Sequence, residues 1–311
     1  MSKFNYDFAP HSFVPFKDRK VLEYCRNIKR EDMEKHSNPD FKIKIVADPA
    51  SILVADMFTR IKVSDEQDQK LVMILPNPWP SAYSNVAELC NVYGVSTRNL
   101  HTFNMDDWAD DLGNVAPINY KAGLGYAFKR TFFDKLEGIS RMPEENMHYV
   151  TTENVNDYSK MIEDIGEGGA DICYSATGWP GHTAFIDPDT TEFAANSLDE
   201  FLELGSRIVT QHPLTIAENS LFEIFGCSGD VAAVPPRAAT IGPRDIKNAR
   251  DHLELHSLTE MGGITSWQRM ISRLTLYAPV NMQIPSTIHQ LFKARVYVSE
   301  AIAQPFAFNT Y

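Results

Sequence analysis

A histidine and an aspartate in one short glycine-containing segment could carry out acid–base chemistry. His182 follows Gly181, and Asp187 lies five residues after the histidine. A carboxylate beside an imidazole can orient the ring and bring its pKa near neutrality, so the pair predicts a general acid or base. The alternative is a loop histidine whose nitrogens bond to backbone carbonyls, because short motifs of this kind often occur without function.

Acidic and aromatic residues mark two further segments. Asp106 and Asp107 follow an apolar run. A carboxylate there could move a proton, but an adjacent acidic pair is also typical of a helix N-cap in a solvated turn. Trp108 follows the acidic pair, Trp179 precedes His182 by three residues, and Trp79 lies in a third segment, after the apolar run 71–75. They indicate either aromatic faces that stack on sugar rings or tryptophans that cover a hydrophobic core.

Short apolar runs predict the strands that position these loops. Four runs are clear and three are weaker: 42–47, 71–75, 100–105 and 171–176, then 238–242, 252–256 and 294–299. Amphipathic stretches predict helices near 82–92, 122–135, 156–167, 243–251 and 264–275. This alternation predicts an α/β fold with a mostly parallel, Rossmann-like sheet flanked by helices on both faces. Ligands bind beyond the carboxyl ends of such strands, so we expect the three loops to form one site.

The two ends of the chain fall outside this alternation. Residues 1–41 are rich in charged and aromatic side chains, with a helix expected near 19–34. We therefore expect an N-terminal extension over 1–41, a single α/β domain over 42–301, and a short C-terminal tail over 302–311.

Composition excludes several classes of protein. The 311 residues carry a formal net charge of −12, which disfavours binding to nucleic acid, and no apolar run is long enough to span a membrane. Hydrophobic residues at 43% and charged residues at 23% exclude intrinsic disorder. The first residues lack a secretory signal, so we expect a cytoplasmic protein whose widely spaced cysteines are buried thiols: Cys25, Cys90, Cys173 and Cys227.

Two longer segments occur in this order: 102–108, with the sequence TFNMDDW, and 181–188, with the sequence GHTAFIDP. Together they resemble the glucosamine-6-phosphate deaminase/isomerase family, which shares its fold with the 6-phosphogluconolactonases. Segments at 132–134, 143–146 and 234–242 are also similar to the family and occur in the same order. The resemblance covers roughly residues 42–301.

The resemblance implies an enzyme that opens a pyranose ring and moves a proton between C1 and C2, without a metal or another cofactor. It implies that Asp106 is the proton shuttle, that His182 opens the ring, and that Asp187 supports the histidine where the deaminases have glutamate. We expect a small-molecule sugar or sugar phosphate as substrate and a homo-oligomer as the assembly. The residues expected to bind the substrate are Asn77, Trp79, Ser81, Asp107, Gly181 and Arg269.

Several positions depart from the family pattern. Pro180 stands where the family has an acid/base aspartate, and 77–80, with the sequence NPWP, replaces a Gly/Ser/Thr-rich phosphate loop. Ile216 replaces a family arginine, and the family's phosphate-binding lysine has no clear counterpart, with Arg269 the nearest cation. These departures predict altered recognition of phosphate. They leave two alternatives to an isomerase or deaminase: a lactone hydrolase, and a sugar-binding sensor without catalysis.

Overall fold

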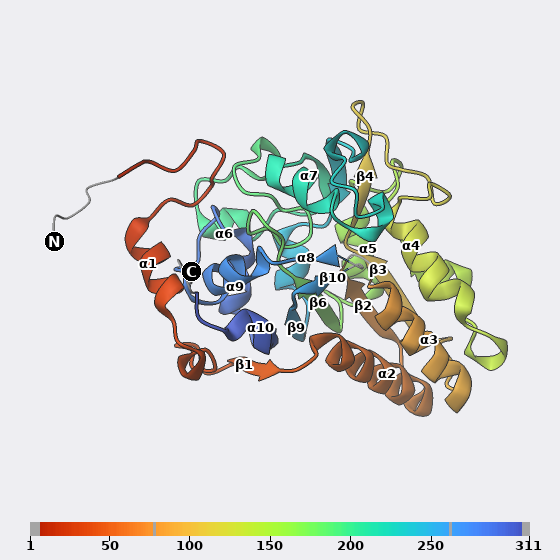
Figure 1. Ribbon diagram of the computed structural model, residues 1–311. Helices are drawn as coiled ribbons and strands as arrows, with labels where there is room; N and C mark the ends of the chain where they lie inside the picture. Colours follow the sequence, from red (N-terminus) through yellow and green to blue (C-terminus); the bar gives the residue numbers. More distant parts are fainter. Residues whose placement is uncertain (1–6, 77–78, 261–262, 307–311) are drawn as a thin grey trace.

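The computed structural model describes residues 7–76, 79–260 and 263–306, and its centre is a parallel β-sheet (Figure 1). The order of its seven strands is β1-β12-β9-β6-β2-β3-β5. Their bounds are β1 Phe41–Val46, β2 Leu71–Leu75, β3 Leu100–Asn104, β5 Met147–His148, β6 Ile172–Ala176, β9 His252–His256 and β12 Ala294–Ser299. Every pairing in this sheet is parallel, so the predicted fold class is confirmed.

Burial along the strands explains their positions in the sheet. All five residues of β2 are buried, as expected for an apolar strand covered on both faces. β1 alternates buried and exposed residues over its first four positions and forms one edge of the sheet. β9 is fully buried although it contains two histidines and Glu254, which is why its sequence predicted a strand only weakly.

Helices flank this sheet. Their bounds are α1 Arg19–Asn27, α2 Pro49–Gln67, α3 Pro80–Tyr93, α4 Leu124–Thr131, α5 Tyr158–Ile165, α6 Leu198–Phe201, α7 Pro213–Asn219, α8 Pro243–Lys247, α9 Gln268–Tyr277 and α10 Glu300–Ala303. Short 3-10 helices lie at Arg30–Asp32, Phe133–Lys135, Gly138–Ser140, Glu144–Asn146, Thr191–Phe193, Glu223–Phe225, Val231–Ala233 and Pro285–Leu291. The helices predicted near 19–34, 122–135 and 243–251 are shorter than expected, because each ends early in a 3-10 turn or an irregular segment.

A second, antiparallel sheet has the order β4-β8-β7 and extends from the carboxyl end of β3. Its strands are β4 Asp106–Ala109, β7 Arg207–Thr210 and β8 Arg237–Thr240. The predicted strand at 238–242 therefore belongs to this sheet and not to the parallel one. Asp106 and Asp107 open a strand instead of capping a helix. A two-stranded hairpin joins β10 Thr259–Glu260 to β11 Gly263–Ile264.

The N-terminal segment packs on the C-terminal elements. Asp18 caps α1 by accepting hydrogen bonds from two backbone N–H groups, and α1 contacts α9 (Figure 1). Three of the cysteine thiols are buried, whereas Cys227 is exposed, which corrects the expectation of four buried thiols; none forms a disulfide. Within the described part of the chain, no helix has the length and apolar character needed to cross a membrane.

Candidate active site

A hollow with an enclosed volume of about 40 Å³ lies at the carboxyl ends of β2, β3 and β6, where the sequence predicted a site. The hollow is lined by Pro76, Trp79, Met105, Asp106, Ala176, Thr177, Gly178, His182, Ala184, Glu218 and Phe222. None of these described residues is a lysine or an arginine.

The predicted contact between His182 and Asp187 is present in the structure. His182 Nδ1 lies 2.6 Å from Asp187 Oδ1, and both side chains are buried. Two further donors hold the carboxylate: the Thr215 hydroxyl at 2.7 Å and the backbone N–H of His212, also at 2.7 Å. A carboxylate fixed in this way holds the proton of the imidazole on Nδ1 and leaves Nε2 to face the hollow.

Glycines before the histidine make this position possible. A Cβ on Gly178 would lie only 2.0 Å from His182 Nε2, so no larger residue fits there without moving the imidazole. Gly181 has φ +94°, a conformation that side chains other than glycine rarely adopt. The carbonyl of His182 accepts hydrogen bonds from the Thr177 hydroxyl and the Gly178 N–H, which close the loop.

Glu218, which the sequence did not single out, approaches the imidazole from the side opposite Asp187. Its Oε1 lies 3.7 Å from His182 Nε2, and its Oε2 accepts a hydrogen bond of 2.6 Å from the N–H of Trp179. Glu218 is 4% exposed and extends from α7. The helix has seven residues, about two turns, which is too short for its pattern of apolar and polar residues to predict that Glu218 is buried.

The charges of Glu218 and Asp187 act on His182, and the imidazolium of His182 acts on Glu218. Burial by itself lowers the pKa of His182, but the charges of Glu218 and Asp187 outweigh burial and raise it to about 9. Burial raises the pKa of Glu218 to about 7, against the opposing effect of the imidazolium. Glu218 therefore changes protonation near neutral pH, as acid–base catalysts do, while His182 loses its proton at a higher pH.

Asp106 lines the same hollow. Its carboxyl is 3% exposed and makes no hydrogen bond with another described residue. Burial raises its pKa well above the usual range; His182 lowers it, while Asp107 and Asp187 raise it further. Such a carboxylate is a stronger base than an exposed aspartate.

The residues expected to bind the substrate divide between this hollow and other places. Trp79 lines the hollow, and Gly181 belongs to the loop that carries His182. Ser81 lies on a different, neighbouring hollow, and Asn77 lies outside the described residues.

Asp107 and Arg269 are engaged by backbone groups away from the hollow. The Asp107 carboxylate accepts the N–H groups of Trp108, Leu124 and Gly125, while burial raises its pKa to about 6. The Arg269 guanidinium donates to the carbonyls of Gln304 and Pro305. Neither residue lines the hollow, so the structure does not bring these two predicted residues to it.

The three candidate tryptophans have different surroundings. Trp108 is 1% exposed and donates its indole N–H to the carbonyl of Ala122, so it belongs to the core. Trp179 stacks on Trp267, with the ring centres 5.9 Å apart. Of the three, Trp79 is the one that lines the hollow. Across the described residues, no group of three or more His, Cys, Asp or Glu side chains is arranged to hold a metal ion.

Comparison with known proteins identifies relatives of this chain. No model of a known protein family matches it. The chain is 27% identical over 200 residues to the glucosamine-6-phosphate deaminase of Caenorhabditis elegans, covering 62% of this chain and 66% of that enzyme, slightly less than two thirds of its length. It is 28% identical over 258 residues to the glucosamine-6-phosphate deaminase of Yersinia enterocolitica, covering 76% and 86%.

Solved structures share the fold. A monomeric glucosamine-6-phosphate deaminase superposes with a TM-score of 0.66 at 16% identity, covering 85% of this chain and 99% of the other. The 6-phosphogluconolactonase of Leishmania guyanensis superposes with a TM-score of 0.58 at 11% identity, covering 86% and 99%. At these identities, the superpositions show a common fold.

Proposed function

Because the chain is a divergent member of the glucosamine-6-phosphate deaminase family, we propose that it isomerises or deaminates an amino sugar or a related aldose. The reaction opens the sugar ring and then moves a proton between C1 and C2. The observation that carries the proposal is the buried row Asp187–His182–Glu218, which shares one hollow with the carboxyl of Asp106.

Ring opening needs an acid for the ring oxygen and a base for the hydroxyl on C1. His182, held by Asp187, donates its Nε2 proton to the ring oxygen as the bond between that oxygen and C1 breaks. The Glu218 carboxylate accepts the proton of the C1 hydroxyl and, 3.7 Å from Nε2, returns it to the imidazole. Glu218 thereby supplies the carboxylate that Pro180 cannot supply.

Isomerisation then needs one base that serves two neighbouring carbons. Asp106 removes the C2 proton of the open-chain aldehyde and delivers it to C1. An amino sugar gives an imine at C2, which water hydrolyses to a ketose and ammonia, and a 2-hydroxy aldose gives the ketose directly. The raised pKa of Asp106 suits this step, because a stronger base better accepts a carbon-bound proton.

The experiment that tests this function is exchange of the C2 proton with deuterated water, followed by NMR on the sugar substrate. Asp106→Asn should keep the fold and slow exchange by about 10²–10⁴-fold, the usual effect of losing a positioned base. His182→Gln should slow the reaction of cyclic sugar more than that of an open-chain analogue. Exchange by Asp106→Asn at the parent rate would remove Asp106 from the mechanism.

We propose that this protein differs from the family in how it recognises the end of the sugar that carries the phosphate in glucosamine 6-phosphate. A phosphate dianion in a partly closed pocket needs several N–H donors or cations, because an unpaired buried charge is costly. The described residues around the hollow include no lysine or arginine, whereas Asp106 and Glu218 are acidic. We therefore expect glucosamine 6-phosphate to bind no better than glucosamine in calorimetry. A preference of about 100-fold for the phosphate, equivalent to about 2.7 kcal/mol, would contradict this.

Lactone hydrolysis is the second candidate, and the His182–Asp187 pair is the observation that favours it. An imidazole oriented by a carboxylate can activate water for attack on an ester carbonyl. A lactonase has no step at C2, so Asp106→Asn would leave hydrolysis of a sugar lactone unchanged while His182→Gln abolishes it. The two variants therefore separate the two functions.

A further inference from the structure

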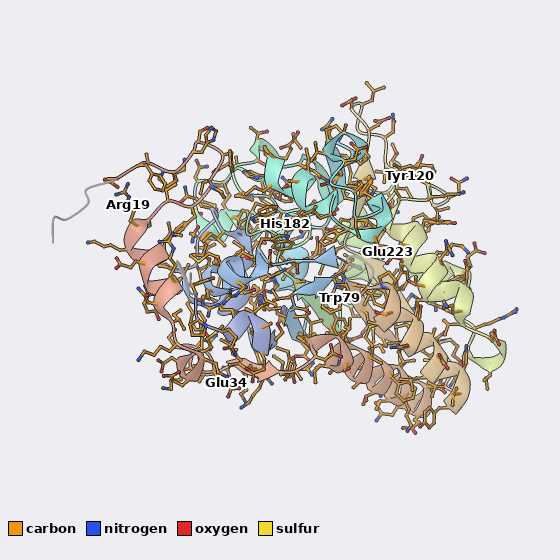
Figure 2. The ribbon with its side chains drawn as sticks, viewed as in Figure 1. Arg19, Glu34, Trp79, Tyr120, His182 and Glu223 are labelled. Carbon is orange, nitrogen blue, oxygen red and sulfur yellow. The ribbon has the colours of Figure 1, made fainter. Side chains whose placement is uncertain are left out.

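A second hollow, of about 650 Å³, adjoins the candidate active site. Trp79 lines both hollows, and the neighbours Phe222 and Glu223 line the first and the second respectively. The second hollow lies at the carboxyl ends of β1, β9 and β12. Figure 2 labels Trp79 together with His182 of the first hollow and Glu223 of the second.

Two hydroxyl groups on the wall of the second hollow, those of Ser81 and Ser299, make no hydrogen bond with another described residue. Ser81 is exposed at the start of α3, and its side chain makes no hydrogen bond within the described structure. Ser299 precedes α10 and is 6% exposed, yet its hydroxyl is left without a hydrogen-bond partner. A buried hydroxyl without a partner is unfavourable, so a small reorientation toward a ligand would improve its environment.

The charges around this hollow disfavour an anion. The N-terminal ends of α2, α3 and the short helix α10 lie on its wall, and each is equivalent to at most about +0.5 of a charge. Asp48 and Glu223 place two carboxylates there, and Asp48 already caps α2 by accepting from the N–H of Ala50. The two carboxylates together exceed the three helix ends by at least about half a negative charge. No lysine or arginine stands among the described lining residues.

We propose that the second hollow is a sugar subsite, which binds a neutral, hydroxyl-bearing extension of the sugar whose ring lies in the first hollow. This inference rests on the proposed function. The reaction needs a free C1, so the extension must be attached on the far side of the ring, at O4 or O6. The ligand is then a disaccharide with an amino sugar at its reducing end, and the Trp79 indole contacts both units.

Calorimetry on the full chain tests the subsite with three probes: glucosamine, a 1,4-linked disaccharide of glucosamine, and glucosamine 6-phosphate. The disaccharide should bind at least about tenfold more tightly than glucosamine, equivalent to about 1.4 kcal/mol. Ser81→Trp places an indole in the hollow and should abolish this preference. Val92→Trp adds the same indole at an exposed position near the other end of α3 and should retain it.

The possible results distinguish failure of the subsite proposal from failure of the proposed function. Equal binding of the two unphosphorylated sugars, or tightest binding of the phosphate, overturns the subsite. Deuterium exchange at C2 of glucosamine reports on the proposed function independently, so exchange without a disaccharide preference overturns the subsite alone. Absence of both binding and exchange overturns both proposals. If Ser81→Trp does not fold, Glu223→Ala replaces it and should reduce the disaccharide preference several-fold.

Discussion

Replacing Glu218 with glutamine isolates the electrostatic effect of this carboxylate on the catalytic imidazole. The substitution keeps the size of the side chain, and the amide oxygen can still accept the N–H of Trp179. It removes a negative charge 3.7 Å from His182 Nε2. The charge of Asp187 on the other ring nitrogen remains.

The expected change in the pKa of His182 follows from this distance. At an effective dielectric constant of about 20, two unit charges so separated attract by about 4 kcal/mol. One pH unit corresponds to about 1.4 kcal/mol, so the full charge is equivalent to about 3 pH units. Because Glu218 itself titrates near pH 7, part of this attraction is absent at neutral pH. We expect the pKa of His182 to fall from about 9 by about 1–3 pH units.

NMR titration of the His182 ring protons measures this change directly, with Glu203→Gln as the control. Glu203 is exposed and forms an ion pair with Lys247, so its variant should leave the imidazole unaffected. The alkaline limb of the pH–rate profile should move to lower pH together with the pKa. If the pKa of His182 in Glu218→Gln stays within about 0.3 of the parent value, Glu218 does not act on the imidazole.

The same variant should change how stability depends on pH. A raised histidine pKa stabilises the folded state fully below the unfolded value of about 6.5, and this stabilisation is lost as the pH rises through about 9. The parent protein should therefore lose free energy of unfolding between these values. Glu218→Gln should show a smaller loss over the same range in thermal unfolding experiments.

Three further substitutions test other parts of the structure. Gly178→Ala should displace the imidazole of His182, because the added Cβ would overlap Nε2, and should reduce turnover at least about 100-fold while the protein stays folded by circular dichroism. Asp107→Asn should lower the free energy of unfolding in urea by about 1–3 kcal/mol, since one of its three backbone donors loses its acceptor; an unchanged stability would contradict the anchoring role. Glu223→Lys should improve binding of glucosamine 6-phosphate about 5–10-fold in low-salt calorimetry, and no improvement would show that charge does not decide which ligand binds there.

The sequence predicts the parallel sheet well because its strands are apolar runs. The strands at 71–75 and 100–105 are recognisable from composition alone, since burial on both faces requires it. The small antiparallel sheet is less predictable. Its strands span four residues each, and β4 begins with two aspartates that also fit a turn.

In the site, too, contacts within one loop can be predicted from the sequence, whereas contacts made by packing of distant segments cannot. His182 and Asp187 are close in sequence, so their contact follows from one loop. Glu218 reaches the imidazole because α7 packs against that loop. The two residues are far apart in the sequence, so their spacing does not predict this contact. Asp107 and Trp108 have residue types that suit binding, but backbone groups of the 120–125 segment engage both side chains. The roles assigned to Asp106, His182 and Asp187 stay predictions until the variants are measured.

The position of β1 has a consequence for the order in which the protein can fold. Among the described strands of the sheet, β1 is the first in the sequence, and it pairs there with β12, the last of them. A ribosome adds about 5–20 residues per second, so β1 emerges tens of seconds before the strand that pairs with it. During that interval its backbone donors and acceptors are open to other chains. The exposed lysines Lys42 and Lys44, which alternate with its buried residues, are well placed to discourage such pairing until synthesis ends.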